Sequence, residues 1–397
     1  MRSFRIGRLF GIPIELDLTF LLVLPLFAYL IGTTLAEYAS LVNEVLRPTN
    51  LVEVSALAGE PTVALVVGLV AAVGLFVGVT IHELGHSLVA MRYGFPISSI
   101  KLWLFGGVAQ LSEMPDDWKQ ELNIAVAGPV VSVLLGVVSY VAFTAVRPGG
   151  TAVAALRFLL AYLAVVNVGL AIFNMLPGFP MDGGRVLRAL LARRRSYARA
   201  TQIAAEVGKL FAIGLGLFGL FGGGLFLIAI AFFIYIGASS EAQRTVMAAA
   251  FDGVVVRDIM TPAADLETVS PDASVADLLG QMFTERHTGY PVVEDGRPVG
   301  VVTLGDAQSV KEIERDAYRI EEVMSRDIEF AAPDTSAMDA LEQMQEADVG
   351  RLLVMDDGEL VGLLSRTDLM TALEIIKQGG AVSRSGESLG TAFGQTD

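Results

Sequence analysis

Stretches of about 20 mostly apolar residues restrict the fold of this chain most, because such runs cross the hydrocarbon core of a bilayer as helices. Six occur, at roughly 16–31, 61–90, 124–146, 153–175, 203–221 and 224–236. Only three glycines, Gly222 to Gly224, separate the last two runs; they favour a tight turn, although a single continuous span would reduce the count to five. The sequence therefore predicts a polytopic α-helical membrane domain of about six transmembrane helices, over residues 1–240.

Charge changes sharply along the chain. Residues 1–250 carry 17 basic and 14 acidic side chains, whereas residues 251–397 carry 11 basic and 29 acidic ones. An apolar, mildly basic part followed by a strongly acidic part is typical of a membrane domain with a soluble domain attached. Because an acidic surface repels the phosphate backbone, no nucleic-acid partner is expected.

Arginines near the ends of the spans predict the orientation, because cytoplasmic loops are enriched in Lys and Arg. They cluster before the first span and between the fourth and fifth spans, at Arg2, Arg5, Arg8, Arg185, Arg188, Arg193, Arg194, Arg195 and Arg199. With six spans, both termini of this multi-pass protein of the cell membrane are then cytoplasmic, and the 32–60 loop lies outside. We interpret the arginines between the fourth and fifth spans as a signal of membrane orientation rather than as a binding site.

After Gly237 the apolar runs stop, and an internal repeat of about 62 residues appears. Ser270-Pro-Asp-Ala-Ser274 recurs as Ala332-Pro-Asp-Thr-Ser336, where each serine is placed to cap the helix that follows it. Each copy alternates helix-like with strand-like runs, which predicts a soluble α+β module with copies at 254–311 and 318–378. Residues 241–253 are expected to be a linker and residues 379–397 a disordered tail.

Two of the three histidines lie four residues apart in His82-Glu83-Leu-Gly-His86. On a helix this spacing places both imidazoles on one face within reach of one metal ion, with Glu83 near the metal-bound water. The motif ends a long apolar span, where a charged side chain raises the free energy of membrane insertion by about 2.5–3.5 kcal/mol. Chance is therefore a poor explanation for the presence of Glu83 between two histidines. The alternative is a pair of histidines hydrogen-bonded between helices beside a neutral Glu83.

A zinc ion bound by two histidines needs a third protein ligand and an open position for water. The chain has no cysteine, and its third histidine, His287, lies in the acidic part and is expected to be an ordinary surface or core residue. A carboxylate is therefore required, and Asp182 is the candidate, because it follows a segment in which Pro177 and Pro180 break the fourth span. The alternative role for Asp182 is the N-cap of the next helix.

These motifs resemble the site-2 protease family of intramembrane zinc metalloproteases. The resemblance rests on His82-Glu83-x-x-His86, Asn174-x-x-Pro177, Met181-Asp182-Gly183, Phe105-Gly-Gly-Val-Ala-Gln110 and Ala127-Gly-Pro129. It implies that His82, His86 and Asp182 bind zinc. It further implies that Glu83 is the general base and that Asn174 assists at the substrate carbonyl. The implied substrate is a single-span membrane protein, cleaved within or near its transmembrane segment in regulated intramembrane proteolysis.

Strand-like runs at 99–104 and 108–111 flank Gly106 and Gly107. A substrate helix hides its carbonyls and has to be opened before it is cleaved, so an exposed strand edge here is suited to pair with the unwound segment. The alternative is an ordinary hairpin at the membrane interface.

The repeat resembles a tandem of cystathionine-beta-synthase (CBS) domains, which often binds adenosine nucleotides such as AMP or ATP. The resemblance places the ribose hydroxyls at Asp306 and Asp368 and the phosphates near Thr303 and Ser365. The first copy matches better, because Leu352 stands in the second copy where the first has Pro291. Arginines are available to offset the acidic charge, at Arg286, Arg297, Arg351 and Arg366. The alternative is a scaffold pair without ligand, and a homodimer through the module is expected.

The expected function is therefore an intramembrane zinc metalloprotease regulated by a nucleotide. Two other functions are considered: a catalytically inactive protein that holds a partner helix in the same pocket, and a transporter or channel gated by the CBS pair. The intact His82-Glu83-x-x-His86 and Asp182 disfavour the first. The second is disfavoured because the apolar part lacks two similar halves.

Overall fold

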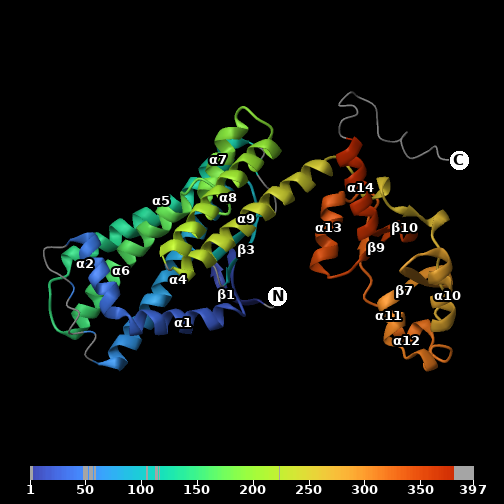
Figure 1. Ribbon diagram of the computed structural model, residues 1–397, viewed down its shortest axis with the longest axis horizontal. Coiled ribbons are helices and arrows are strands. Elements are labelled where there is room, and N and C mark those ends of the chain that lie inside the picture. Colours follow the sequence, from blue (N-terminus) through green and yellow to red (C-terminus); the bar gives the residue numbers. More distant parts are fainter. Residues whose placement is uncertain are drawn as a thin grey trace. The chain divides into compact units, whose positions relative to one another are not determined.

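The computed structural model describes residues 3–47, 52, 57, 60–103, 106–111, 115, 117–222 and 224–379. The chain divides into two units, Met1–Gln243 and Arg244–Asp397 (Figure 1). This boundary falls within the predicted linker, most of which is helical, because the last long helix of the first unit continues to Ala250. Of the predicted tail, only Gly379 is among the described residues.

Five helices are long and apolar enough to cross a membrane: α4 (Pro61–Arg92), α5 (Trp118–Ala145), α6 (Thr151–Asn174), α8 (Tyr197–Gly222) and α9 (Leu225–Ala250). The pair α1 (Phe20–Thr33) and α2 (Leu35–Leu46), bent by 75°, makes a sixth when it is taken as one span. This confirms the predicted membrane domain of about six helices. The predicted turn also separates α8 from α9; Gly223 itself lies outside the described residues.

The first span differs from the prediction in two ways. It begins at Phe20 rather than near Leu16, because Ile12–Asp17 forms a strand, β2. Apolar residues alternate there with a period of two, at Ile12, Ile14 and Leu16, which is the pattern of a strand with one buried face. The predicted 32–60 loop contains α2, whose buried side chains pack in one core with those of α6.

Beside α4 lies a four-stranded sheet in the order β1 (Ser3–Leu9), β2, β3 (Ile97–Trp103) and β4 (Gly106–Leu111). Strands β2 and β3 are parallel, and the other neighbours are antiparallel. The two strand-like runs are therefore strands that pair with each other, and Gly106 and Gly107, expected between them, belong to β4. A Cβ at Gly107 would lie 2.7 Å from Glu83 Cγ, so the edge strand β4 packs directly against α4 at the histidine motif.

Small residues let α4 approach its neighbours closely, which is how helices commonly pack within a membrane. A Cβ on Gly68 would lie 2.4 Å from the carbonyl oxygen of Ala28 in α1. Further along α4, a Cβ on Gly85 would lie 3.0 Å from the carbonyl oxygen of Ala127 in α5. Helix α4 is thus held between α1 and α5, with the histidine motif on its buried part.

The second unit contains the two predicted copies of the α+β repeat. The first has α10 (Val275–Glu285), β6 (Gly289–Glu294), β7 (Arg297–Thr303) and α11 (Leu304–Ser309). Helix α12 (Ile320–Val323) belongs by sequence to the second copy, but Ile320 is buried in the core of the first. The second has β8 (Phe330–Ala331), α13 (Ala337–Glu346), β9 (Arg351–Asp356), β10 (Glu359–Ser365) and α14 (Arg366–Gly379), and the short β5 (Thr261–Pro262) pairs with β10. The predicted caps are confirmed, because Ser274 Oγ and Ser336 Oγ accept hydrogen bonds from the backbone N–H groups of Asp277 and Asp339, both at 3.0 Å.

Candidate metal centre

Helix α4 presents the two histidines of the motif side by side. Both are almost fully buried, with 2% of His82 and 3% of His86 exposed. Their Nε2 atoms lie 3.2 Å apart, as expected for residues separated by four positions on one face of a helix. The four-residue spacing therefore places the two Nε2 atoms side by side, where both can reach one metal ion.

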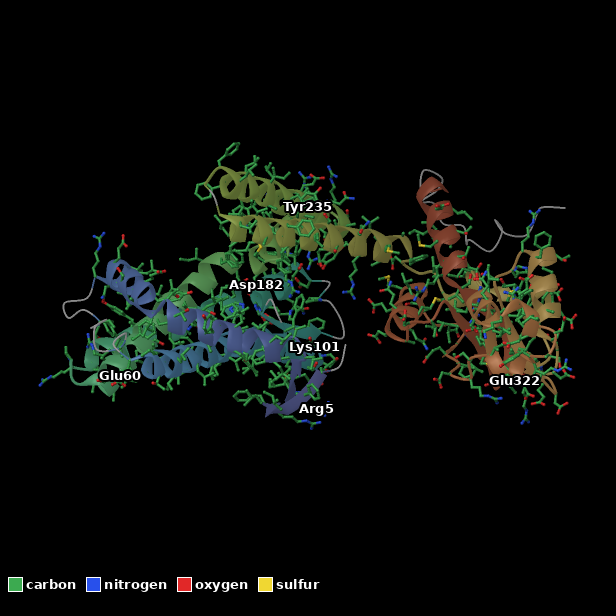
Figure 2. The ribbon with its side chains drawn as sticks, turned by 60° about the horizontal axis from the view of Figure 1, so that its bottom comes forward. Arg5, Glu60, Lys101, Asp182, Tyr235 and Glu322 are labelled. Carbon is green, nitrogen blue, oxygen red and sulfur yellow. The ribbon has the colours of Figure 1, made fainter. Side chains whose placement is uncertain are left out.

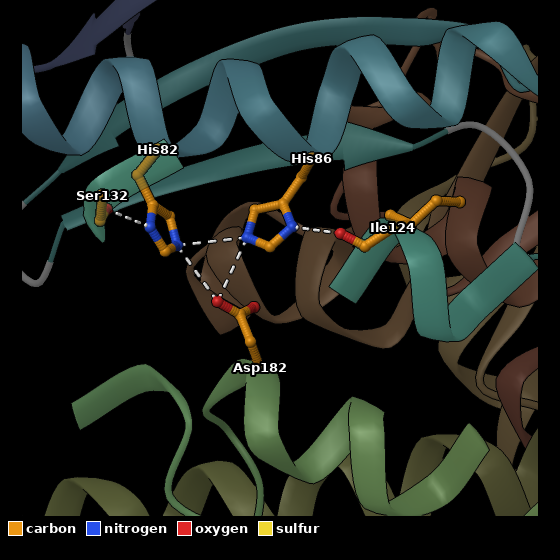
Figure 3. Close-up of polar contacts among 5 residues, drawn as sticks. All are labelled: His82, His86, Ile124, Ser132 and Asp182. Carbon is orange, nitrogen blue, oxygen red and sulfur yellow. Dashed lines mark hydrogen bonds and ion pairs between the residues drawn. The ribbon is translucent and has the colours of Figure 1, made fainter. Parts of the chain in front are cut away.

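Asp182 supplies the third group from a different part of the chain. It is the first residue of α7 (Asp182–Ala192), and its Oδ2 lies 3.1 Å from His82 Nε2 and 3.2 Å from His86 Nε2 (Figure 3). The N-cap of α7 is Met181, so Asp182 does not take the alternative role of a helix cap. Figure 2 places Asp182 among the helices of the first unit, whereas Arg5 and Glu60 project at its surface.

The start of α7 fits tightly against the loop that follows α6. A Cβ at Gly183 would lie 2.2 Å from the carbonyl oxygen of Leu176, so no larger residue fits there without moving the loop. The glycine that follows Asp182 therefore lets α7 begin close to the end of α6. This close packing brings the carboxylate to the histidines of α4.

The three ligand atoms suit a tetrahedral metal ion. Four ligands at about 2.0 Å from zinc form a tetrahedron whose edges are about 3.3 Å long. The three edges here, between His82 Nε2, His86 Nε2 and Asp182 Oδ2, are 3.1, 3.2 and 3.2 Å. Two imidazoles and one carboxylate are also a known set of protein ligands for catalytic zinc, which leaves a fourth position for water.

Hydrogen bonds from α5 orient both imidazole rings. His86 Nδ1 donates to the carbonyl oxygen of Ile124 at 2.7 Å, and a carbonyl only accepts, so in the neutral ring the lone pair is on Nε2. His82 Nδ1 lies 2.8 Å from Ser132 Oγ. Each ring is thus held by α5 through Nδ1, while its Nε2 faces the carboxylate of Asp182.

Gly128 lies between these two positions on α5. A Cβ at this residue would lie 2.2 Å from His86 Nε2, so the helix backbone itself packs against the imidazole. Sequence reasoning singled out Ala127-Gly-Pro129 but missed the roles of Ile124 and Ser132. The available signal was their spacing, since Ile124, Gly128 and Ser132 are four residues apart and share one face of a helix.

The other two predicted catalytic residues do not contribute to the cluster of ligands. Glu83 is half-buried on α4 and packs against Gly107 of β4. Asn174 is the half-buried last residue of α6, separated from Asp182 by the loop Met175–Met181. Within the described residues, only His82, His86 and Asp182 form a group able to hold a metal ion.

Comparison with known proteins identifies the family. The chain matches the family model of peptidase family M50 over residues 70–148 and 142–215, and that of the CBS domain over 256–310 and 320–375. It is 34% identical to zinc metalloprotease MJ0392 of Methanocaldococcus jannaschii, over 94% of this chain and 97% of the relative. The chain belongs to the site-2 protease family.

A second curated relative agrees with this assignment. The putative zinc metalloprotease Rip3 of Mycobacterium tuberculosis is 31% identical over 94% of this chain and 93% of the relative. A solved site-2 protease from M. jannaschii is 35% identical and covers 61% of this chain and 95% of its own, with a TM-score of 0.43. This site-2 protease family member is thus a multi-pass membrane protein of the zinc metalloprotease type that carries a tandem CBS module.

The CBS module of this site-2 protease family member contains a cavity of about 300 Å³ between its two copies. The first copy contributes Arg286, His287 and Thr288, and the second contributes Arg351, Ser365 and Asp368, among other lining residues. His287 is exposed and lies at this cavity. The structure therefore brings the predicted Ser365 and Asp368 to a cavity, although the first copy matched the CBS pattern better.

The predicted nucleotide residues of the two copies take the same local conformation. Asp306 Oδ2 accepts from Thr303 Oγ1 at 2.6 Å, and Asp368 Oδ2 accepts from Ser365 Oγ at 2.7 Å, each pair at the start of a helix. Thr303 and Asp306 are not among the residues that line the cavity. The two matching motifs therefore differ in their surroundings rather than in their own geometry.

Arg351 joins the two copies at the cavity. It donates to Thr288 Oγ1 at 2.8 Å, across from the second copy to the first. Burial lowers the pKa of the Arg351 guanidinium, and the carboxylates of Asp368 and Asp306 counteract this shift. Together with Arg286 it provides positive charge within a strongly acidic domain. Of the four arginines expected to offset the acid, these two line the cavity, and Arg297 and Arg366 do not.

Proposed function

We propose that this protein is a zinc-dependent intramembrane endopeptidase that hydrolyses a peptide bond within or near the transmembrane segment of a single-span membrane protein. The observation that carries the proposal is the convergence of His82 Nε2, His86 Nε2 and Asp182 Oδ2 within 4.8 Å of one another. The apolar helix α4 supplies the two histidine atoms, and the start of the short helix α7 supplies the carboxylate oxygen. The next residue after His82 is Glu83, which completes the HExxH motif.

The roles of the residues follow from their positions. A zinc ion held by the three ligands would polarise the scissile carbonyl and lower the pKa of bound water to about 7. Glu83 takes the proton of the attacking water and passes it to the leaving amine. Asn174, near the start of the loop to Asp182, donates a hydrogen bond to the carbonyl oxygen as negative charge develops there.

The sheet supports a way to present the substrate. A transmembrane helix satisfies its own backbone hydrogen bonds, so its carbonyls become available only when it unwinds locally. Strand β4 is at the edge of the four-stranded sheet and packs against Glu83 through Gly107. An unwound segment that pairs with β4 would therefore lie beside the general base.

The CBS module is proposed to bind an adenosine nucleotide, AMP or ATP, in the cavity lined by Arg351, Ser365 and Asp368, and thereby to regulate proteolysis. The positive charge of Arg286 and Arg351 suits a phosphate group.

The proposal also includes the location of the protein, which is the cell membrane. The arginines before the first span and between the fourth and fifth spans place both termini in the cytoplasm. Pairing of two modules into a homodimer is part of the same proposal.

The test compares wild type with Glu83→Gln, both as full-length protein reconstituted in liposomes with a single-span substrate. The variant is expected to keep one zinc per chain and to lose cleavage by about 100-fold or more, the usual contribution of a general base. Equal cleavage by both proteins would refute the role of Glu83. A wild-type protein that holds zinc and binds substrates without cleaving them would instead be the inactive helix-binding protein.

A further inference from the structure

A buried arginine on α7 makes ion pairs with two other helices of the membrane unit. Arg188 is only 1% exposed, and its Nε and Nη2 both lie 2.6 Å from Glu121 Oε1 on α5. Its Nη1 lies 2.7 Å from Glu241 Oε1 on α9. One guanidinium therefore connects α7 to both α5 and α9.

Two aromatic rings surround the same guanidinium. The Cζ atom of Arg188 lies 4.9 Å from the centroid of Phe179 and 4.7 Å from that of Tyr197. Phe179 belongs to the loop that leads to Asp182, and Tyr197 is the first residue of α8. We call these five residues the Arg188 clamp: Arg188, Glu121, Glu241, Phe179 and Tyr197.

Arg188 and Glu121 are buried and Glu241 is half-buried, and burying charged groups is costly unless they are paired in good geometry, so the clamp needs a reason beyond membrane topology. Arg193, Arg194, Arg195 and Arg199 of the same cluster are exposed, as expected for a cytoplasmic loop. Arg188 is the buried exception, and sequence reasoning did not separate it from the others. The planar fork of arginine suits two carboxylates and aromatic faces at once, which lysine does not.

The clamp contacts the elements that hold the metal ligands. Glu121 lies one turn before Ile124, whose carbonyl accepts the hydrogen bond from His86 Nδ1. Arg188 lies on the short helix that begins with Asp182, about 9 Å further along its axis. The pair between Glu121 and Arg188 therefore ties the helix of the carboxylate ligand to the helix that orients a histidine ligand.

Glu241 connects the clamp to the helix that leads into the CBS module. Three residues later, Arg244 Nη2 lies 2.5 Å from Glu342 Oε1 on α13 of the second CBS copy. Met247 and Ala250, at the end of α9, pack against the core of that copy. One continuous helix thus carries a carboxylate of the clamp and, about one turn further on, the first contacts of the module.

We infer that Arg188 is a positioning residue that sets the place of Asp182 relative to the two histidines, and that Glu241 makes zinc affinity depend on α9. The inference rests on the proposed zinc centre. A shift of α9 that weakens the pair between Glu241 and Arg188 loosens α7 at its buried face. Asp182, at the beginning of α7, then leaves the position at which the three ligand atoms match one ion.

The test measures the zinc dissociation constant of the full-length protein in detergent, by competition with a chelator. Arg188→Lys keeps the charge but loses the fork, and Glu241→Gln keeps the size but loses the charge. Each variant is expected to raise the dissociation constant by about 10- to 100-fold, the range for residues that support metal ligands. In cobalt-substituted protein the visible absorption bands should shift in both variants.

Two controls separate positioning from a loss of stability. Arg157→Lys changes another buried arginine, on α6, which contacts the carbonyl oxygen of Val146 and the ring of Phe143. Glu206→Gln makes the same chemical change as Glu241→Gln at an exposed position on α8. Both control variants are expected to bind zinc with wild-type affinity.

The outcomes distinguish the inference from the proposed function. Wild-type zinc affinity and unchanged cobalt bands in folded Arg188→Lys and Glu241→Gln would overturn the role of the clamp and leave the zinc centre intact. If Arg188→Lys does not fold, Glu241→Gln alone decides, because the pair of Arg188 with Glu121 remains in that variant. A wild-type protein that binds no zinc would refute the proposed function itself.

Discussion

Replacing Gly128 by alanine tests whether the backbone of α5 shapes the metal centre. The added Cβ would lie 2.2 Å from His86 Nε2, whereas ordinary contacts begin at 3.4 Å, so the ring has to retreat by about 1.2 Å. Helix α5 cannot simply move away from the ring. It also carries Ile124, whose carbonyl oxygen accepts from His86 Nδ1 at 2.7 Å, so a shift that relieves the contact breaks the hydrogen bond.

The magnitude follows from the cost of overpacking. Inserting a methyl group into a well-packed site costs about 1–3 kcal/mol, and each 1.4 kcal/mol is a factor of ten in affinity. Metal ligands tolerate displacements of only about 0.2 Å, so this cost appears directly in zinc binding. We expect the zinc dissociation constant of Gly128→Ala to rise by about 10- to 100-fold, with a corresponding loss of proteolysis at limiting zinc.

Gly169→Ala is the matched control. Gly169 lies on the membrane-spanning helix α6, and apart from the neighbouring backbone of its own helix no atom of the described residues lies within 4 Å of the position of its Cβ. This variant should bind zinc like wild type and be as stable or slightly more stable, because alanine favours a helix over glycine by about 1 kcal/mol. Chelator competition and thermal unfolding of both full-length variants provide the comparison. Wild-type zinc affinity in Gly128→Ala would refute the account of α5.

Three further predictions concern other contacts. Ser132→Ala removes the partner of His82 Nδ1, and isothermal or chelator titration should show about a tenfold weaker zinc affinity; an unchanged value would mean that the hydroxyl does not orient the ring. Arg351→Ala should weaken AMP binding to the full-length protein by at least tenfold in equilibrium dialysis, whereas Arg297→Ala, at an exposed position that does not line the cavity, should not; equal effects would place the nucleotide elsewhere. Ser274→Ala should lower the stability of the CBS unit by about 1 kcal/mol in chemical denaturation, and no change would exclude a stabilising cap.

The elements with strong periodic signals were predictable from the sequence. The apolar runs gave the long helices, because a helix in lipid must satisfy its own backbone over about 20 residues. The repeat predicted the two CBS copies, and the histidine spacing predicted the two candidate ligands on α4. The third candidate ligand, Asp182, was predicted from the lack of cysteine and from the broken backbone before it, and the structure brings these three residues together.

The short elements were not predictable in the same way. Strand β2 and helix α2 have fewer residues than a membrane span. The end of β2 was therefore assigned to the first predicted span, and α2 to the predicted 32–60 loop. Contacts between distant segments left no local pattern either. Nothing near Arg188 in the sequence marks Glu121 or Glu241 as its partners, and nothing near Ser365 marks Arg286 as a residue of the same cavity.

Removal and return of the metal test the central claim most directly. Full-length protein in liposomes is stripped of metal with a chelator, assayed on a single-span substrate, and assayed again after one equivalent of zinc is added. We predict that cleavage disappears with the metal and returns with the zinc, and that Asp182→Ala neither retains zinc nor cleaves. Undiminished cleavage by metal-free protein would contradict the account.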